Sequence, residues 1–229
     1  MNSNVGQEPS RTTLGVAPDV VRRKVQALIT LATLAVVALT DAGSFARQAT
    51  AEQQVTLLAA GDVAMCHGRP ASESMAARTA ALIERIPGTV IAAGDLAYWQ
   101  GSERDFTDCY DPTWGRFKAR TLPVPGNHEY DSPDATPYYA YWGSAAGQPG
   151  KGYYSVQVGS WRVIGLNSNI AAHAGSEQER WLREDLKTNP AHCTLAFWHH
   201  PVFSSGLEGG NDPKMGDIFQ ALYEAGADL

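Results

Sequence analysis

TVIAAGD, at residues 89–95, sets the interpretation of the whole chain. A short run of β-branched and small apolar residues that ends in Gly-Asp is typical of a buried strand opening into a loop. The same arrangement occurs upstream, where VTLLAA (55–60) is followed by Gly61-Asp62. A helical pattern separates the two strands, so we expect an α/β domain in which helices cover a mostly parallel sheet.

Further strands are expected downstream. TLPVP (121–125) is a third buried run, and GYYSVQVG with WRVIGLN (152–167) alternates around a Gly-Ser turn in the manner of a hairpin. CTLAFW (193–198) is a last strand, and two histidines follow it. These segments add some antiparallel pairing to the predicted sheet.

Three helices are expected between and after these strands. The first covers residues 72–86, the second follows Ser176 and Glu179 with the spacing of a capping box, and the third starts at Asp212-Pro213. Their apolar faces are expected to carry these side chains: Met75, Thr79, Leu82 and Ile86; Trp181, Leu182 and Leu186; Ile218, Phe219 and Leu222.

The first 51 residues differ in composition from the rest. Three basic residues at 22–24 precede the apolar run VQALITLATLAVVAL (25–39), and small residues follow, which is the pattern of an export signal. The run is shorter than the ~20 residues of a spanning helix. We expect residues 1–51 to be an export segment, residues 52–229 to be the functional domain, and the protein to be secreted or otherwise extracytoplasmic. A membrane anchor at the N-terminus is the alternative.

Length and charge narrow the class of function. A chain of 229 residues is long enough for one sizeable core. The formal net charge is −6 and the pI is about 5.5, so no nucleic-acid partner held by a basic surface is expected. An acidic protein that handles phosphates has to gather positive charge locally, and metal ions are the obvious means.

Side chains that can bind metal follow four of the predicted strands: Asp62, Asp95, Asn127 and His199. Singly, each has an ordinary explanation as a turn residue, a helix cap or a buried histidine. Their recurrence at one edge of an α/β sheet favours a shared site. Carboxylate, amide oxygen and imidazole suit a pair of divalent or trivalent ions better than a lone structural zinc. One carboxylate between two ions would bridge them and hold a hydroxide nucleophile, which serves the hydrolysis of phosphate esters.

Four blocks of the sequence resemble the calcineurin-like metallophosphoesterases: GDVAMC (61–66), GDLAYW (94–99), GNHEY (126–130) and FWHHP (197–201). The spacing from Gly94 to Tyr98 matches the GDxxY pattern of the purple acid phosphatase branch. The first motif lacks the usual histidine, since Ala64 stands in its place, and Tyr98 is the apparent replacement. The resemblance covers about residues 55–229 and implies a layered αββα sandwich of mixed sheets.

The resemblance also implies a role for each matching residue. Asp62 and Tyr98 would bind the first metal, Asp95 would bridge, and Asn127 and His199 would bind the second. A tyrosinate ligand favours a hard, oxidised ion, so we expect Fe(III) together with divalent Fe, Zn or Mn.

The histidines beside these ligands are expected to act on the substrate. His128 would contact the phosphate or protonate the leaving alkoxide, a task suited to a group that titrates near neutrality. His200 would line the substrate site or hold a neighbouring residue, and Glu129 is expected to support the site rather than bind metal. The predicted reaction is hydrolysis of phosphomonoesters, with a phosphorylated small molecule or protein as substrate.

The three cysteines fit an exported chain with one disulfide. Cys66 and Cys109 each follow one of the acidic motifs, so we predict that these two are paired and that Cys193 is left as a thiol.

The chain lacks one motif of the family it resembles. The GHxH block that supplies two further imidazoles has no counterpart, because the sequence stops at YEAGADL (223–229). We therefore expect a fold that is incomplete at its C-terminus. Two alternatives to an active enzyme follow: a truncated, non-catalytic remnant that binds metal or phosphate weakly, or a surface protein that binds sugars or cell wall through Tyr138, Tyr139, Tyr141 and Trp142.

Overall fold

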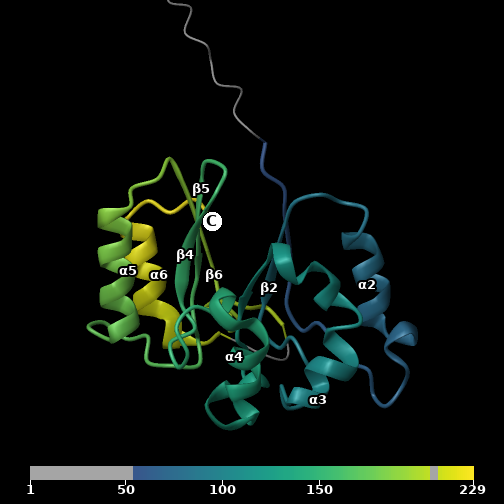
Figure 1. The fold of residues 1–229 in the computed structure, drawn as a ribbon. Coiled ribbons are helices and arrows are strands. Elements are labelled where there is room, and N and C mark those ends of the chain that lie inside the picture. The colour runs from purple at the N-terminus through teal and green to yellow at the C-terminus, as the bar shows by residue number, and fades with distance from the viewer. Residues whose placement is uncertain (1–53, 207–210) are drawn as a thin grey trace, which may run out of the picture. The chain divides into compact units, whose positions relative to one another are not determined.

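Six strands form two three-stranded sheets in the computed structural model, which describes residues 54–206 and 211–229 (Figure 1). The described residues belong to one compact unit, Glu52–Leu229. The predicted export segment at 1–51 lies outside them. Within the part of the chain that the structure describes, no helix is long and apolar enough to cross a membrane.

The first sheet has three parallel strands, in this order: β1 (Leu57–Ala60), β2 (Thr89–Ala93) and β3 (Thr121–Val124). The register places Ala60 opposite Ala92 and Ala93 opposite Val124, so the strands end level with one another. Because parallel strands all end at the same edge, the loops that follow them emerge side by side. The three apolar runs predicted from the sequence are confirmed as strands.

The second sheet mixes strand directions, in this order: β4 (Tyr154–Val158), β5 (Trp161–Gly165) and β6 (Cys193–Phe197). β4 and β5 form the predicted hairpin, and β6 pairs with β5 in parallel. Asp228 N–H donates to the Thr194 carbonyl at 2.9 Å. Ala196 N–H donates to the Leu229 carbonyl at 2.8 Å, so the last residues lie along the outer edge of β6. Two small sheets in a mixed α/β domain agree with the expected sandwich, although only the second sheet is mixed.

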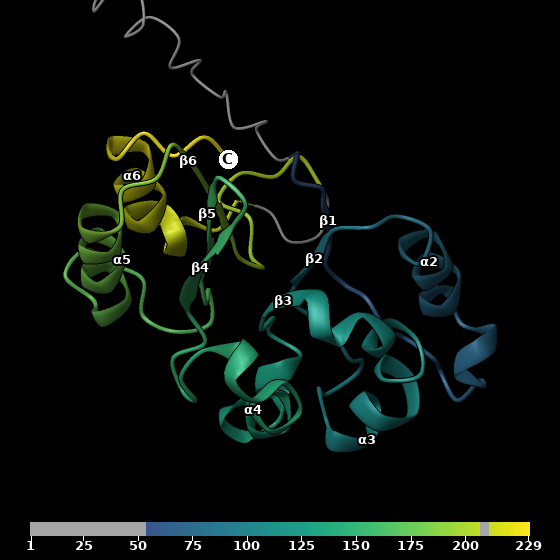
Figure 2. The same ribbon diagram turned by 45° about the horizontal axis from the view of Figure 1, so that its top comes forward.

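Helices flank both sheets: α2 (Met75–Ile83), α3 (Glu103–Asp105), α4 (Thr136–Trp142), α5 (Glu177–Thr188) and α6 (Gly216–Glu224). α5 and α6 lie side by side along the second sheet, whereas α2 lies along the first (Figures 1 and 2). A π-helical turn at Phe106–Tyr110 continues α3. Short 3-10 turns occupy other connections: Ala71–Glu73, Trp114–Arg120, Glu129–Asp131, Pro133–Ala135, Gly143–Ala146 and Pro213–Met215.

Each sheet has its own hydrophobic core beneath its helices. The second core packs β5 against α5 and α6 through these side chains: Ile164, Leu182, Ile218 and Leu222. The first core is rich in aromatic residues, among them Tyr110, Trp114, Tyr138 and Trp142. Tyr138 is 0% exposed and Trp142 is 3% exposed, so the alternative of a surface protein binding through these aromatics is wrong.

The two sheets contact one another through closely packed residues. A Cβ placed on Gly165 of β5 would lie 3.0 Å from Val124 Cγ1 of β3, so the glycine permits the close approach of the sheets. Tyr154 Oη also donates to the Pro123 carbonyl at 2.9 Å. This contact brings the loop after β6 to the edge where β1, β2 and β3 end.

The predicted inward face of the first helix is wrong. α2 begins at Met75 rather than at residue 72 and buries Ala76, Ala80 and Ile83. Met75 and Leu82 are 65% and 63% exposed. Ser74 sets the start of the helix, because its side chain accepts the N–H of Ala77. Alanines then form the buried stripe, since small side chains let a helix lie close to a sheet.

Two smaller expectations need correction. On α6, Phe219 is 40% exposed while its neighbours Ile218 and Leu222 are buried. At the start of α5, Ser176 accepts the N–H of Glu179 as a capping box requires. The Glu179 carboxylate accepts instead from the N–H of Gly175, one residue before the cap, because the chain turns there in a left-handed conformation.

Candidate metal centre

The loops after β1, β2, β3 and β6 line one pocket of about 720 Å³. The structure brings together in it all seven side chains that the sequence analysis assigned to metal or substrate: Asp62, Asp95, Tyr98, Asn127, His128, His199 and His200. They come from segments far apart in the chain, and the parallel ends of the first sheet place most of them. Their roles as ligands stay predictions.

The carboxylate of Asp95 is at the centre of the group. Tyr98 Oη donates to Asp62 Oδ1 at 2.7 Å and also lies 3.1 Å from Asp95 Oδ2. On the other side, His199 Nε2 is 3.4 Å from Asp95 Oδ2 and 3.2 Å from Asn127 Oδ1. Asp95 therefore lies between one oxygen-rich pair, Asp62 and Tyr98, and a second pair that contributes an amide and an imidazole.

The backbone of the two Gly-Asp loops is held in an uncommon conformation. Asp62 and Asp95 both have positive φ, at 55° and 52°. Such a conformation costs about 1 kcal/mol or more, and it persists where surrounding bonds hold it. Here Asp62 N–H donates to the Gly94 carbonyl at 3.0 Å and Val63 N–H to the Asp95 carbonyl at 2.9 Å. The two loops thus run as a pair and present both carboxylates on one side.

Two glycines allow the loops to approach closely. A Cβ on Gly126 would lie 2.1 Å from Asp95 Oδ1, and a Cβ on Gly94 would lie 2.6 Å from Cβ of His199. Any side chain at either position would push a predicted ligand out of place. The glycines of the GD and GN motifs are therefore needed for contact between side chains as well as for turning the chain.

Glu129 binds the loops together from beneath the pocket. Its carboxylate is 0% exposed and accepts four backbone N–H groups: those of Asp95 (2.9 Å), Leu96 (2.8 Å), Ala97 (3.2 Å) and Gly126 (2.7 Å). Burial raises the pKa of Glu129 to about 7, against the opposing effect of these N–H groups. The sequence indicated a supporting role, but nothing in the motif showed that this side chain joins the loop after β2 to the loop after β3.

His128 is oriented by its neighbours. Its Nδ1 lies 2.6 Å from the Trp99 carbonyl and 3.1 Å from Asp131 Oδ2. A carbonyl oxygen only accepts, so Nδ1 carries a proton. Nε2 is then the nitrogen that faces Asp95 Oδ2, at 3.8 Å. The backbone N–H of His128 donates to Asp95 Oδ1 at 3.0 Å, which fixes this histidine relative to the central carboxylate.

His199 has the orientation typical of a metal-binding imidazole. Its Nδ1 lies 3.0 Å from the Ala93 carbonyl, so Nδ1–H donates and Nε2 points toward Asp95 and Asn127. Burial lowers the pKa of His199, but the hydrogen bond and charge of Asp95 outweigh it, and the net shift is upward. Burial raises the pKa of Asp95, but its bonds to His199 and His128 outweigh this effect, so the pKa of Asp95 lies below its ordinary value.

His200 lines the pocket and is also held by a hydrogen bond to the loop that follows β5. Its Nδ1 is 2.8 Å from Ser168 Oγ, and its ring stands edge-on to that of His199 at 4.8 Å. Burial, followed by the charge of His199, lowers the pKa of His200. Its predicted contact with substrate is compatible with this position and stays a prediction.

The donor set fits metal cations. The pocket lining holds two carboxylates, a phenol, an amide and imidazoles, and among the described residues it holds no Lys or Arg. Burial, and then the carboxylates of Asp62 and Asp95, raise the pKa of Tyr98 far above its ordinary value. Negative charge therefore gathers here with only histidines, and no Lys or Arg, among the described lining residues to balance it. Within residues 54–206 and 211–229, no three His, Cys, Asp or Glu form a metal-holding cluster by themselves, so the predicted site depends on Tyr98 and Asn127.

A disulfide joins Cys66 to Cys109, with Cα atoms 5.9 Å apart, and Cys193 is a free thiol. The bond ties the loop after β1 to the π-helical turn of the first core. It therefore anchors the loop that carries Asp62.

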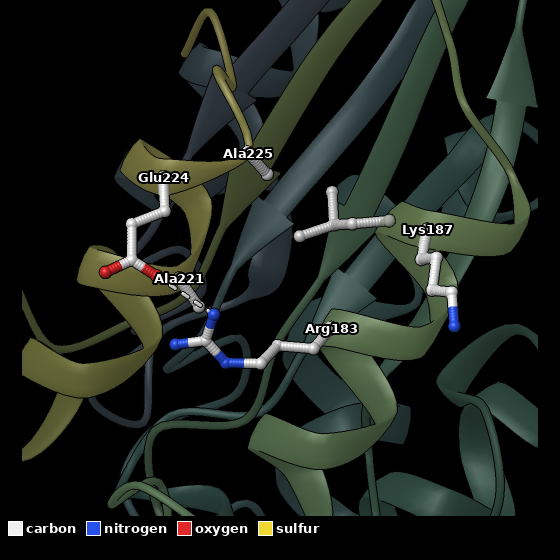
Figure 3. A pocket seen from close by; sticks show the side chains of 6 residues that line it. Arg183, Lys187, Ala221, Glu224 and Ala225 are labelled. Carbon is white, nitrogen blue, oxygen red and sulfur yellow. Dashed lines mark hydrogen bonds and ion pairs between the residues drawn. The ribbon is translucent and has the colours of Figure 1, made fainter.

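A different pocket, of about 340 Å³, lies between α5 and α6 (Figure 3). Figure 3 shows Arg183 and Glu224 facing one another there, and the two side chains form an ion pair at 3.0 Å. None of the predicted site residues lines it. Two of its three charged residues, Arg183 and Glu224, are therefore paired with one another.

Comparison with protein families gave a clear match. The sequence model of the calcineurin-like phosphoesterase family matches residues 45–226. No curated protein matched the sequence.

Two solved structures share the fold. One is a purple acid phosphatase from yellow lupin (Lupinus luteus) seeds, with 17% identity, a TM-score of 0.58, and coverage of 76% of this chain and 37% of that chain. The other is GAP50, the anchor in the inner membrane complex of Plasmodium, with 14% identity, a TM-score of 0.54, and coverage of 76% and 64%. This chain thus spans less than two thirds of either protein, and identities this low show the fold alone.

Proposed function

Because the chain belongs to the calcineurin-like phosphoesterase family, we propose that it hydrolyses phosphomonoesters in the pocket centred on Asp95. Membership supports a metallophosphoesterase acting on phosphoric esters. The observation that carries the finer proposal is the position of one carboxylate between two sets of donors: Tyr98 at 3.1 Å on one side and His199 at 3.4 Å on the other.

Five side chains would hold two metal ions. Asp62 and Tyr98 would bind the first, Asn127 and His199 the second, and Asp95 both. We expect Fe(III) at the tyrosine side, because phenolate is a hard anionic oxygen, and a divalent Fe, Zn or Mn ion at the other. When bound, the ions would neutralise phosphate charge and make water a better nucleophile at neutral pH.

His128 would complete the reaction as a general acid. Its Nδ1 is held by the Trp99 carbonyl, so a protonated ring would present Nε2–H toward the pocket. As a water oxygen bonds to phosphorus and the bond between phosphorus and the ester oxygen breaks, this proton would pass to the departing oxygen, which leaves as a neutral alcohol. His200 would contact the phosphate from the opposite wall.

We also propose that the domain works outside the cytoplasm. Residues 1–51 would direct export, and the disulfide between Cys66 and Cys109 supports an oxidising compartment. The substrate would be a phosphorylated small molecule or protein, without a nucleic-acid partner, and any membrane contact would come from an uncleaved N-terminal segment. N-terminal sequencing of the exported protein would locate the cleavage point.

Metal content and turnover of 4-nitrophenyl phosphate test the function. The proposal predicts two bound ions per chain. It also predicts a visible charge-transfer absorption from the Tyr98 phenolate to the iron, which Tyr98→Phe should abolish. A protein that is folded but binds no metal and turns over no ester would instead support the non-catalytic remnant.

A further inference from the structure

A second cavity, of about 440 Å³, adjoins the candidate metal centre. Its walls are the loop at residues 66–69, the start of α3, and the side chains of Tyr98 and Trp99. The same two aromatic residues also line the 720 Å³ pocket. The two cavities therefore share Tyr98 and Trp99 in their walls.

Trp99 has an exposure that the packing of the fold does not explain. It is 53% exposed, whereas Trp114 and Trp142 of the adjacent core are 4% and 3% exposed. A large aromatic ring left open beside a polar pocket is typical of a ligand contact. The ring centroid is 5.5 Å from that of His67 and 5.9 Å from that of His128, both in edge-on arrangements. The indole of Trp99 thus contacts two rings: that of His128, the predicted general acid, and that of His67.

The position of Trp99 is coupled to that of His128. The Trp99 carbonyl lies 2.6 Å from His128 Nδ1, so the two residues are held together by a backbone contact that does not depend on the indole. The oxygen that His128 protonates is the one attached to the leaving group. That group must therefore lie beside the indole as it departs.

The charges of the second cavity leave it suited to an uncharged or weakly anionic ring. Arg104 pairs with Asp108 at 3.0 Å. Asp105 accepts from the backbone and hydroxyl of Ser102. Among the described residues, no carboxylate lies within ion-pair distance of Arg69. Both carboxylates of the cavity are thus bound by neighbouring residues, and neither is left free to repel the electron-rich face of an aromatic ring placed against Trp99.

We propose that Trp99 is the platform for the leaving group and that the enzyme prefers aryl phosphate esters, whose ring lies against the exposed part of the Trp99 indole. This inference rests on the proposed phosphoesterase function and specifies its substrate class. An aromatic contact of this kind corresponds to a factor of about ten in binding or rate.

The test compares phenyl phosphate with 2-glycerophosphate in the full chain loaded with metal. The quantity measured is the ratio of their kcat/KM values in each variant relative to wild type, because the intrinsic reactivity of the two esters then cancels. Trp99→Ala should lower this ratio about tenfold, and Trp99→Phe should recover most of it. Phe203→Ala is the matched control: Phe203 is 71% exposed and does not line the metal pocket, so the ratio should not change.

Binding supplies a second readout that needs no turnover. Wild-type protein should bind phenylphosphonate about tenfold more tightly than methylphosphonate by calorimetry, and Trp99→Phe should keep most of this difference. Equal affinities, or an unchanged ester ratio in Trp99→Ala with both esters still hydrolysed, would overturn the platform and leave the phosphoesterase function standing. If the wild-type protein neither hydrolysed an ester nor bound a phosphonate, the proposed function would fail, and the platform with it.

Discussion

The two sheets of the domain treat their carboxylates in opposite ways. At the edge of the first sheet, Asp62, Asp95 and Glu129 are bound by a phenol, by imidazoles and by backbone N–H groups. Along the second sheet, three carboxylates of α5 form ion pairs with Lys or Arg: Glu177 with Lys151, Glu179 with Arg183, and Asp185 with Arg162.

This difference separates a structural region from a functional one. An ion pair that is complete within the chain contributes to stability and has no need of a further charge. A group of carboxylates without Lys or Arg partners favours the binding of cations. Burial, and then these carboxylates, raise the pKa of the neighbouring Tyr98. The described lining of the pocket, which has carboxylates but no Lys or Arg, is compatible with the proposed metal site.

The largest effect is expected from Asp95→Asn. The substitution removes the charge that both ions would share, so kcat should fall about a thousandfold or more and the bound metal should be lost. The melting temperature of the metal-free protein should fall slightly at neutral pH, because the bonds to His199 and His128 favour the ionised Asp95 and hold its pKa below the ordinary value. Steady-state kinetics, metal analysis and thermal melts measure the three quantities. If the variant retained its metal and full turnover, Asp95 would not be the shared ligand.

Arg162→Ala should damage the second sheet without affecting the chemistry. Its guanidinium is 16% exposed and pairs with Asp185, which is 9% exposed and also accepts from Ser155 Oγ. Removing one member of such a pair leaves a buried charge, and we expect a loss of about 3 kcal/mol in the free energy of unfolding. Urea denaturation gives this value, and kcat per folded molecule should equal that of wild type. A fall in kcat with unchanged stability would reverse the comparison between the sheets.

Glu129→Gln should affect both stability and metal binding, to a smaller degree. The amide NH₂ would face backbone N–H groups that now donate to a carboxylate oxygen, at a cost of about 2 kcal/mol. The loop carrying Asp95 would be less well held, so metal affinity should fall roughly tenfold to a hundredfold. Denaturation and metal titration measure the two effects. Glu177→Gln, at a side chain that is 66% exposed, is the control and should change neither.

The smallest effect is expected at Arg183, which pairs with Glu179 and with Glu224 between α5 and α6. The arginine is 48% exposed, so water can replace it beside Glu179. That carboxylate is 6% exposed but keeps the N–H of Gly175, so Arg183→Ala should cost about 1 kcal/mol. The hydrogen bond from Arg183 holds the pKa of Glu179 below 4.5. Its contribution is therefore present above pH 4.5 and is lost as the pH falls through the lower folded-state pKa. Thermal melts of both proteins should differ at pH 7 and converge in acid; a difference that grew in acid would contradict this.

Much of the site could be predicted from sequence because its residues directly follow strands. Runs such as TVIAA are recognisable locally, and parallel strands end at a common edge, so Asp62, Asp95 and Asn127 had to meet. The inward face of α2 was not recognisable in this way. Its buried stripe consists of alanines, which contribute little to a hydrophobic pattern, while the more apolar Met75 and Leu82 are exposed.

By itself the amino-acid sequence determined the α/β class, the strands, the order of the motifs and the chemical kinds of donor that meet at the edge of the first sheet. Only the tertiary structure decided that Glu129 would bind two loops, that Arg162 would balance Asp185, and that Trp99 would stand open between two cavities. The reason is physical: strand and helix patterns arise from neighbouring residues, whereas the partner of a carboxylate or a ring is chosen by packing between segments distant in the chain.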